Sequence, residues 1–527
     1  MRVTTATVAT TVTAMACLLV AGCGGTREPV GEASASTSAR TQGPPLPAGP
    51  RATDSADPGA AGPDGTQKGT GDWRIRRPAE GRIEAFTTVS SGPPGTQVGV
   101  KVSTSAGSYR VTAYRIGAYK GGWGSQVWQS EPQRGRLQPE AVFAPAETRT
   151  VVAPWSEDLT IDTTGWKPGY HVIKLRTGTG FETQVPYVVS SPSAAGTVAL
   201  VAPITTWQAY NQWGGYSLYH GPDGDRRSWA VSFDRPYQGA VGANDYRLAA
   251  LPIVLRAEQL GIPLSYFTNV DLDRRPELLA GARGYASLGH DEYWTTGMRR
   301  AVTRARDAGT NLAFFGANTM YWRIRLEDRD TGPARLVVGY RDDAHVDPLR
   351  EERPADATSR FRDAPVPRPE HELIGMQYEC FPVDADYLVV SPRWWGFAGT
   401  GVGYGDRLEG LVGPEADRVY PDRLLPHPLQ VLAHTPYDCR GVTTTAQSVY
   451  YTTPSGAGVF TAGTLRWGCA MIDGCDRPID DQVGRFVSTV TGTVLKEFAA
   501  GSVGERHPAR ENLDDFDLPL VNSVSAS

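Results

Sequence analysis

The chain has 527 residues, of which 40% are apolar and 21% charged, and its formal net charge is −5. This length allows two or three folded domains, and the small net charge, without a basic stripe, argues against a nucleic-acid partner. The numbers of glycine (59), proline (40), tryptophan (13) and tyrosine (22) favour strands, loops and an aromatic-lined site over a helical bundle.

The N-terminus has the pattern of an export signal. Arg2 precedes a mostly apolar run, residues 8–20, that is too short to span a membrane comfortably. The run ends in Val20-Ala21-Gly22-Cys23, which resembles a bacterial lipobox. We therefore predict that residues 1–22 are a lipoprotein signal peptide and that Cys23 carries the lipid. The alternative is an ordinary secretory signal. The expected location is the extracytoplasmic face of the cell membrane.

The next two segments differ sharply in composition. Residues 23–72 are rich in Gly, Pro, Ala, Ser and Thr, which predicts a disordered linker. In residues 73–190, short alternating runs such as 98–102, 109–114 and 170–175 are separated by turn clusters. This pattern is typical of a β-sandwich, and we predict one of immunoglobulin-like kind.

From residue 191 to about 500 the pattern alternates between strands and helices. The continuous apolar run 197–204 predicts a strand buried on both faces. Such alternation predicts an α/β domain with a doubly wound, mainly parallel sheet. The alternation of strands and helices is lost over about 328–452, which we interpret as a long, loop-rich insertion. A last strand pair and a closing helix at 480–495 follow, and 501–527 is expected to be an irregular tail.

Four cysteines remain after the predicted processing. An even number in an exported chain indicates disulfides. Three connectivities are possible. We prefer Cys469 with Cys475, which close a small loop, and Cys380 with Cys439. A zinc site is the alternative, but no C-x2-C spacing supports it.

Polar side chains follow several of the predicted strands. His290 and Glu292 follow the run 284–288 and are two residues apart, so an extended chain would point them to one side. Asn318 ends the next strand. In an open α/β sheet such strand ends converge on one crevice. The chain has no G-x-S-x-G elbow, no cysteine at these strand ends and no H-E-x-x-H motif. The candidate chemistry is therefore oxygen ligands, one histidine and one asparagine.

Several ordered motifs resemble the C-terminal domain of the β subunit of N,N-dimethylformamidase. Tyr114-Arg-Ile-Gly-Ala-Tyr-Lys-Gly-Gly122 also resembles the β-rich domain of that family. The resemblance implies an amidotransferase/flavodoxin-like α/β domain, without the nucleophilic cysteine, and hydrolysis of the C–N bond of a small amide. The motifs in the α/β part are Thr206-Trp-Gln-Ala-Tyr-Asn-Gln-Trp-Gly-Gly215, Phe233-Asp-Arg-Pro-Tyr237, Gly289-His-Asp-Glu-Tyr-Trp294 and Gly316-Ala-Asn-Thr-Met-Tyr-Trp-Arg323.

The resemblance also implies a mononuclear iron held by two tyrosines and one glutamate. Phenolates and a carboxylate are hard anionic ligands that suit Fe(III), and a metal-bound hydroxide would attack the amide. His290 would pass a proton to the leaving amine and Asn318 would stabilise the oxyanion. By position in the motifs, the metal ligands would be Glu292, Tyr210 and Tyr237, with Tyr216, Tyr219 and Tyr170 as rivals for the second tyrosine.

Each of these residues also has a purely structural interpretation. Glu292 could cap the helix that begins near Thr295 or pair with Arg299, His290 could be a buried core histidine, and Asn318 a turn residue. The alternative function is accordingly a non-catalytic surface lipoprotein that binds a glycan or a partner. The expected partners are a small amide substrate, the membrane through the lipid, and a second copy of the chain or the small second subunit of the family's enzyme.

Overall fold

The computed structural model describes residues 67–518 except 80, 223–225, 239–245 and 473. The predicted signal peptide, Cys23 and nearly all of the linker 23–72 lie outside the described residues. None of the described helices is long and apolar enough to cross a membrane.

The first part of the described chain is built from two sheets that share one core. Their strand orders are β1-β3-β9 and β2-β11-β10-β4-β5, with β6 beside β4, and β7 and β8 form a separate antiparallel pair. Alternate residues of facing strands, such as Val98 and Val100 in β3 and Val111 and Ala113 in β4, lie in one buried cluster, as the alternating sequence predicts. The strands are β1 Ile83–Thr87, β2 Ser91–Gly92, β3 Gln97–Thr104, β4 Ser108–Ile116, β5 Gly124–Gln129, β6 Gln133–Arg134, β7 Val142–Phe143, β8 Val151–Val152, β9 Leu159–Asp162, β10 Gly169–Thr177 and β11 Glu182–Val189.

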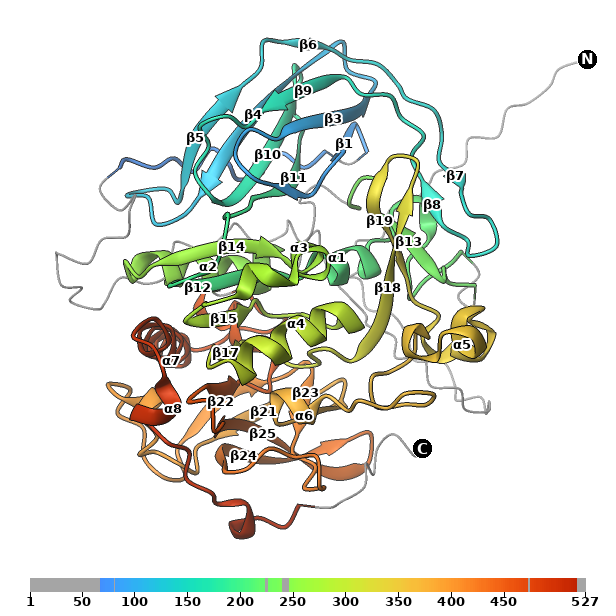
Figure 1. The fold of residues 1–527 in the computed structure, drawn as a ribbon. Helices are drawn as coiled ribbons and strands as arrows, with labels where there is room; N and C mark the ends of the chain where they lie inside the picture. The colour runs from blue at the N-terminus through green and yellow to red at the C-terminus, as the bar shows by residue number, and fades with distance from the viewer. Residues whose placement is uncertain (1–66, 80, 223–225, 239–245, 473, 519–527) are drawn as a thin grey trace, which may run out of the picture. The chain divides into compact units, whose positions relative to one another are not determined.

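A seven-stranded sheet of order β14-β12-β15-β17-β26-β25-β24 forms the centre of the second part (Figure 1). Neighbours from β14 to β26 are parallel, and β26, β25 and β24 are antiparallel. The hairpin β24–β25 comes from the segment 328–452, which we expected to be a loop-rich insertion. The strands are β12 Val198–Ala202, β14 Leu264–Thr268, β15 Gly284–Ser287, β17 Asn311–Phe314, β24 Leu429–Cys439, β25 Val442–Thr452 and β26 Gly458–Thr461.

Helices cover both faces of this sheet. Along β12, Val198 and Leu200 pack in the same buried cluster as α2 and α7, whereas Ala199 and Val201 pack in the cluster that contains α4. A strand buried on both faces needs an unbroken apolar run, which explains the sequence from 197 onward. The helices are α1 Ile204–Tyr210, α2 Leu251–Gln259, α3 Asn269–Arg274, α4 Thr296–Asp307, α5 Leu349–Glu352, α6 His371–Ile374, α7 Asp481–Ala499 and α8 Val503–Arg506.

Three smaller sheets complete the second part. A four-stranded sheet has the order β13-β19-β18-β16, and two strand pairs are β20-β23 and β21-β22. The expected combination of many β-strands with fewer helices is thus confirmed. The strands are β13 Ala230–Ser232, β16 Tyr293–Thr295, β18 Trp322–Arg329, β19 Gly332–Val338, β20 Gln377–Cys380, β21 Ala385–Leu388, β22 Arg407–Val412 and β23 Ala416–Arg418.

Two disulfides lie within the second part of the chain, and an ion pair joins the second part to the first. The disulfides are Cys380–Cys439 and Cys469–Cys475, so the preferred pairing is confirmed. Arg115 of β4 places Nη2 2.8 Å from Oε1 of Glu258 in α2, and both side chains are buried. This ion pair joins the β-rich part to the central sheet.

Candidate active site

The carboxylate of Glu292 lies between two tyrosine hydroxyls. Tyr210 donates to Oε2 at 2.7 Å, and Tyr219 donates to Oε1 at 2.7 Å. The two phenol oxygens are 2.9 Å apart, and the rings stack with centroids separated by 4.4 Å. The two phenol oxygens and the two carboxylate oxygens of Glu292 therefore converge on one point, and we call these three residues the tyrosine–glutamate cluster.

The segment that follows β12 brings both tyrosines to this point. β12 leads directly into α1, whose last residue is Tyr210. Gly214 and Gly215, in the 3-10 turn η1 (Trp213–Gly215), have φ of +75° and +85°, which glycine adopts without strain. This turn reverses the chain so that Tyr219 stacks on Tyr210.

Arg235 holds the same turn from behind. Its guanidinium donates to the carbonyls of Asn211 at 2.7 Å, Tyr216 at 2.8 Å and Trp213 at 3.1 Å. The side chain is buried, and burial lowers its pKa to about 9. The planar fork of an arginine can satisfy several carbonyls at once, so one side chain fixes the whole segment between the two tyrosines.

Glu292 comes from the loop between β15 and β16. Its backbone N–H donates to Oγ1 of Thr206 in α1 at 3.0 Å, which ties the glutamate to the helix that carries Tyr210. Gly289, at the start of the loop, has a φ of +79°, and a Cβ there would lie 2.5 Å from Cβ of Ala249. The sharp turn after β15 thus requires glycine.

The structural interpretations of Glu292 do not hold. Thr295 caps α4, since its side chain accepts from the N–H of Met298 at 2.9 Å. Arg299 pairs with Glu372, at 2.8 Å between Nη2 and Oε2. The Glu292 carboxylate is instead used by the two tyrosines and by His290.

His290 lies beside two carboxylates. Its Nε2 is 3.3 Å from Oε2 of Glu292 and 3.8 Å from Oε2 of Glu415, which immediately precedes β23. Burial raises the pKa of Glu415. His290 and a hydrogen bond with Asn318 act in the opposite direction, whereas the charge of Glu292 adds to the rise. Glu415 is therefore a carboxyl group that holds its proton more tightly than an ordinary glutamate.

Asn318 follows β17 in a left-handed conformation, with a φ of +56°. Its backbone N–H donates to Oδ1 of the buried Asp417 at 2.8 Å, and burial raises the pKa of Asp417 to about 7. Its side-chain Oδ1 is buried and has no hydrogen-bond partner among the described residues. The backbone of Asn318 therefore fixes the position of its side-chain amide, and Oδ1, a hydrogen-bond acceptor, is left for a ligand.

A positive charge faces the ring of Tyr219 from the side away from Tyr210. The guanidinium carbon of Arg341 lies 3.8 Å from the Tyr219 ring centroid, and Nη1 donates to the Leu218 carbonyl at 2.6 Å. Burial and the Glu292 charge raise the pKa of both Tyr210 and Tyr219 well above 10, and Arg341 partly offsets this for Tyr219. Both phenols therefore remain protonated unless a cation is bound.

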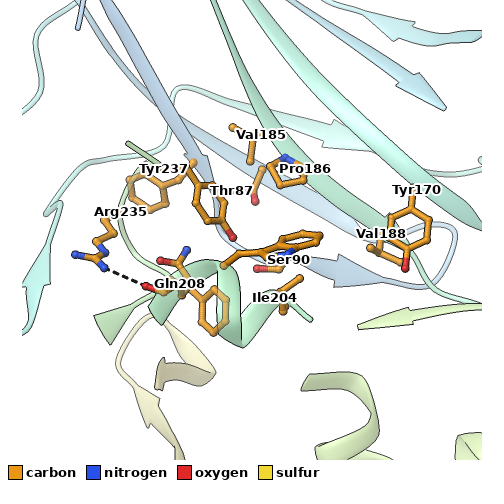
Figure 2. Close-up of a pocket in the computed structure, with 13 residues that line it drawn as sticks. Thr87, Ser90, Tyr170, Val185, Pro186, Val188, Ile204, Gln208, Arg235 and Tyr237 are labelled. Atoms are coloured by element: carbon orange, nitrogen blue, oxygen red, sulfur yellow. Dashed lines mark hydrogen bonds between the residues drawn. The ribbon is translucent and has the colours of Figure 1, made fainter. Parts of the chain in front are cut away.

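Tyr237, which we expected beside Glu292, lies elsewhere. It lines a cavity of about 20 Å³ between α1 and the β-rich part, together with Thr87, Pro186 and Arg235 (Figure 2). Its hydroxyl pairs with the side chain of Gln208. The second tyrosine at Glu292 is Tyr219 instead.

The other two rivals for the second tyrosine position also point away from the cluster. The Tyr216 ring packs edge-on against Phe143, with centroids 5.1 Å apart. The Tyr170 ring packs against Tyr266, with centroids 5.8 Å apart. Tyr219 was thus among the alternatives that the sequence left open, and the direction of the turn after α1 selects it.

Glu415, Asp417 and Arg341 were not anticipated. The acidic residues alternate in Gly413-Pro414-Glu415-Ala416-Asp417, but an exposed strand edge has the same pattern, so the spacing alone does not identify a site. Only the pairing of β23 with β20, 36 positions or more away in the chain, buries them. Arg341 has no sequence signal that we can name.

Comparison with models of protein families identifies the family of this chain. A model described as N,N-dimethylformamidase beta subunit-like, C-terminal, matches residues 110–477. The chain belongs to this family. The match includes the tyrosine–glutamate cluster, His290 and Asn318. Comparison with curated proteins gives no match.

The donor set of the site differs from the commonest metal centres. Within the described ranges, no three His, Cys, Asp or Glu side chains are grouped as a metal site. The anionic donors here are one carboxylate and two phenols whose oxygens lie 2.7–2.9 Å apart. Such a set fits a hard cation of high charge, which can displace phenol protons, better than zinc.

Proposed function

We propose that this protein hydrolyses the C–N bond of a small amide at the tyrosine–glutamate cluster. The observation that carries the proposal is the convergence of the oxygen atoms of Tyr210, Tyr219 and Glu292 beside a buried histidine and a buried carboxyl group. Membership of the N,N-dimethylformamidase beta subunit-like family supports the same reaction class.

We further propose that the cluster holds one Fe(III). Two phenolates and one carboxylate supply three negative charges, which balance a trivalent ion, and all three are hard oxygen ligands. Because burial keeps both phenols protonated, only a strong Lewis acid would ionise them near neutral pH. When bound, the ion would supply Lewis-acid polarisation of the amide carbonyl and activation of water.

The remaining side chains have roles that follow from their positions. His290, with Nε2 3.3 Å from Glu292 and 3.8 Å from Glu415, accepts the proton that water releases as its oxygen bonds to the carbonyl carbon. Glu415, which holds a proton of its own, gives that proton to the amine nitrogen as the C–N bond breaks, and the proton on His290 then restores Glu415. The side-chain amide of Asn318 carries two N–H donors. One pairs with Glu415, and the other donates to the carbonyl oxygen as negative charge develops there.

The alternative of a non-catalytic scaffold explains these groups less well. A binding protein has no need of a buried glutamate with a raised pKa next to a histidine, because both are costly to bury. A histidine next to such a carboxyl group can instead transfer protons during a reaction. This favours catalysis at the cluster over simple binding there.

The proposed function is tested with the purified chain and a panel of small amides that begins with formamides. We expect amine release, about one iron per chain, and loss of both in Glu292→Ala. Amine release that survives Glu292→Ala would place the reaction elsewhere, and a protein with neither iron nor amine release would exclude the proposal.

We also propose the fold relationships and the location that the sequence indicates. Packing of two β-sheets around one core supports an immunoglobulin-like domain, and parallel strands covered by helices on both faces support an amidotransferase/flavodoxin-like domain. The disulfides support an exported protein, since they persist in oxidising compartments, and the proposal of a lipid anchor rests on the sequence Val20-Ala21-Gly22-Cys23. Replacement of Cys23 by Ser should release the protein from membranes, and gel filtration with mass measurement would detect a second copy or a small second subunit.

A further inference from the structure

The outer face of the sheet β5-β4-β10-β11 is divided into two halves. At one end, Tyr114 and Ile116 of β4 and Tyr170 and Val172 of β10 pack into the core shared with the central sheet. At the other end, the face is open and polar and forms the floor of a groove of about 950 Å³. This volume is at the upper end of the range for ligand sites in proteins. None of the residues that line the groove belongs to the tyrosine–glutamate cluster.

The strand register places charged side chains next to one another on this floor. Arg110 of β4 is directly opposite Arg176 of β10, and Arg176 is opposite Glu182 of β11. In the next row, Thr112 is opposite Lys174 on one side and Gln129 on the other. Residues that face each other across strands point to the same side of a sheet, so both rows face the groove.

Positive charge in the groove exceeds negative charge. Five cationic side chains line it, against two carboxylates. Glu182 is shared, at 3.0 Å from Nζ of Lys174 and 3.6 Å from Nε of Arg176. Arg110 donates to the Ser130 carbonyl at 2.8 Å, and it has no carboxylate partner in the described part of the chain. The cations are Arg76, Arg77, Arg110, Lys174 and Arg176, and the carboxylates are Asp72 and Glu182.

The Arg110–Arg176 pair is unfavourable for the sheet by itself. Like charges directly opposite each other on neighbouring strands destabilise the pairing. Only the shared carboxylate of Glu182 offsets the charges of these two arginines. A net positive charge therefore faces the open groove. A ligand with spaced negative charges would relieve this repulsion.

The rest of the lining identifies the kind of anion. Apart from two tyrosines and one proline, no large apolar side chain lines the groove, so it offers no pocket for the apolar side chains of a peptide. Hydroxyl and amide groups are abundant, and they match the hydroxyls of sugars. The polar uncharged side chains are Ser108, Thr112, Gln126, Gln129, Thr177 and Thr179.

We propose that this groove binds an acidic polysaccharide, with sugar carboxylates on Arg110 and Arg176 and sugar hydroxyls on the surrounding amides and hydroxyls. The groove is a second site, independent of the proposed amide hydrolysis. It would hold the catalytic part of the chain against a carboxylated surface polymer.

Binding of polygalacturonate to the full chain tests the proposal, with neutral dextran and a single-stranded oligonucleotide as comparison ligands. We expect polygalacturonate binding that weakens as salt is raised, and no binding to dextran. The double variant Arg110→Gln/Arg176→Gln should bind at least about tenfold more weakly, the size that loss of about 1.4 kcal/mol produces. Amide hydrolysis by this variant should equal that of the parent chain, because the cluster is untouched.

The matched control is Arg300→Gln/Arg304→Gln, which removes two exposed positive charges from α4 and should bind as the parent does. If the groove variant folds poorly, Arg76→Glu replaces it, because the Arg76 side chain is 71% exposed and not needed for packing. Equal losses in the groove and control variants, tighter binding of the oligonucleotide, or no polygalacturonate binding would each overturn the proposal.

Discussion

Tyr210 and Tyr219 share one carboxylate: their hydroxyls are 2.9 Å apart, and each donates to a different oxygen of Glu292 at 2.7 Å. This arrangement stores two protons next to a buried negative charge. A cation that enters the cluster must displace both protons, so metal binding should release protons and weaken as the pH falls. The first prediction follows from this geometry.

Tyr219→Phe and Tyr210→Phe should each remove most of the iron and abolish the visible absorption band of a ferric phenolate, because each removes one anionic ligand. Metal analysis and an absorption spectrum check this. Tyr237→Phe is the matched control, since Tyr237 contacts Gln208 rather than Glu292, and it should keep the band. A band that is lost in Tyr237→Phe and kept in Tyr219→Phe would contradict the assignment.

Glu415→Gln should keep its metal and lose about 10²–10⁴-fold in turnover, the usual contribution of an acid–base group. The side-chain amide of the introduced glutamine cannot give up a proton as the buried carboxyl group of Glu415 does. Steady-state amine release and metal content are the measurements. Glu409→Gln, at a side chain that is 80% exposed, is the control and should behave as the parent; comparable losses in both variants would remove the role of Glu415.

His290→Ala should also retain metal while losing turnover, because the ring lies beside Glu292 and the proposed metal ligands are Tyr210, Tyr219 and Glu292. Added imidazole should restore part of the turnover. Iron loss in His290→Ala would make the histidine a ligand and would change the proposed donor set.

Asp417→Asn should change how stability depends on pH. Burial raises the folded-state pKa of Asp417 to about 7, above its usual value of about 3.9. Between these values the folded chain binds the extra proton, so the contribution of Asp417 to the free energy of unfolding falls as the pH rises from about 4 to 7. The asparagine variant should therefore gain on the order of 4 kcal/mol relative to the parent between pH 4 and pH 8, since each unit of pKa difference corresponds to about 1.4 kcal/mol. Urea unfolding across this range measures it, and a constant difference would contradict the assignment.

Arg115→Met should destabilise the folded chain by about 3–5 kcal/mol, because it leaves Glu258 charged, buried and without its ion-pair partner. Within the described residues, another side chain that hydrogen-bonds to Glu258 is that of Tyr266, whose hydroxyl donates to Oε1 at 2.6 Å. Arg353→Gln breaks an ion pair whose side chains are 62% and 41% exposed, so it should cost less than about 1 kcal/mol. Chemical unfolding of both variants makes the comparison, and equal effects would show that the Arg115–Glu258 pair does not stabilise the contact between the two parts.

Local signals in the sequence were sufficient wherever the structure depends on near neighbours. The apolar run at Val198–Ala202 predicted a strand buried on both faces, and its alternate residues do pack into two different cores. The close spacing of Cys469 and Cys475 predicted their disulfide. His290, Glu292 and Asn318 were found because they follow consecutive strands of one parallel sheet.

Signals failed where the direction of a turn or a distant strand pairing decides the position of a side chain. The sequence does not distinguish Tyr216, Tyr219 and Tyr237 as the second tyrosine at Glu292. The chain reversal at Gly214 and Gly215, which Arg235 holds in place, positions Tyr219 there. Glu415 enters the site only because β23 pairs with β20. No local pattern encodes that pairing.

The disulfide Cys380–Cys439 encloses the segment that contains Glu415, whereas Tyr210, Tyr219 and Glu292 lie outside it. A closed loop of this size has fewer unfolded conformations, which contributes on the order of 4 kcal/mol in the chain-entropy model. Reduction would therefore remove a constraint on the segment that carries Glu415 and leave the chain segments of Tyr210, Tyr219 and Glu292 without any change in their covalent links. A reduced protein should accordingly lose turnover before it loses its proposed metal.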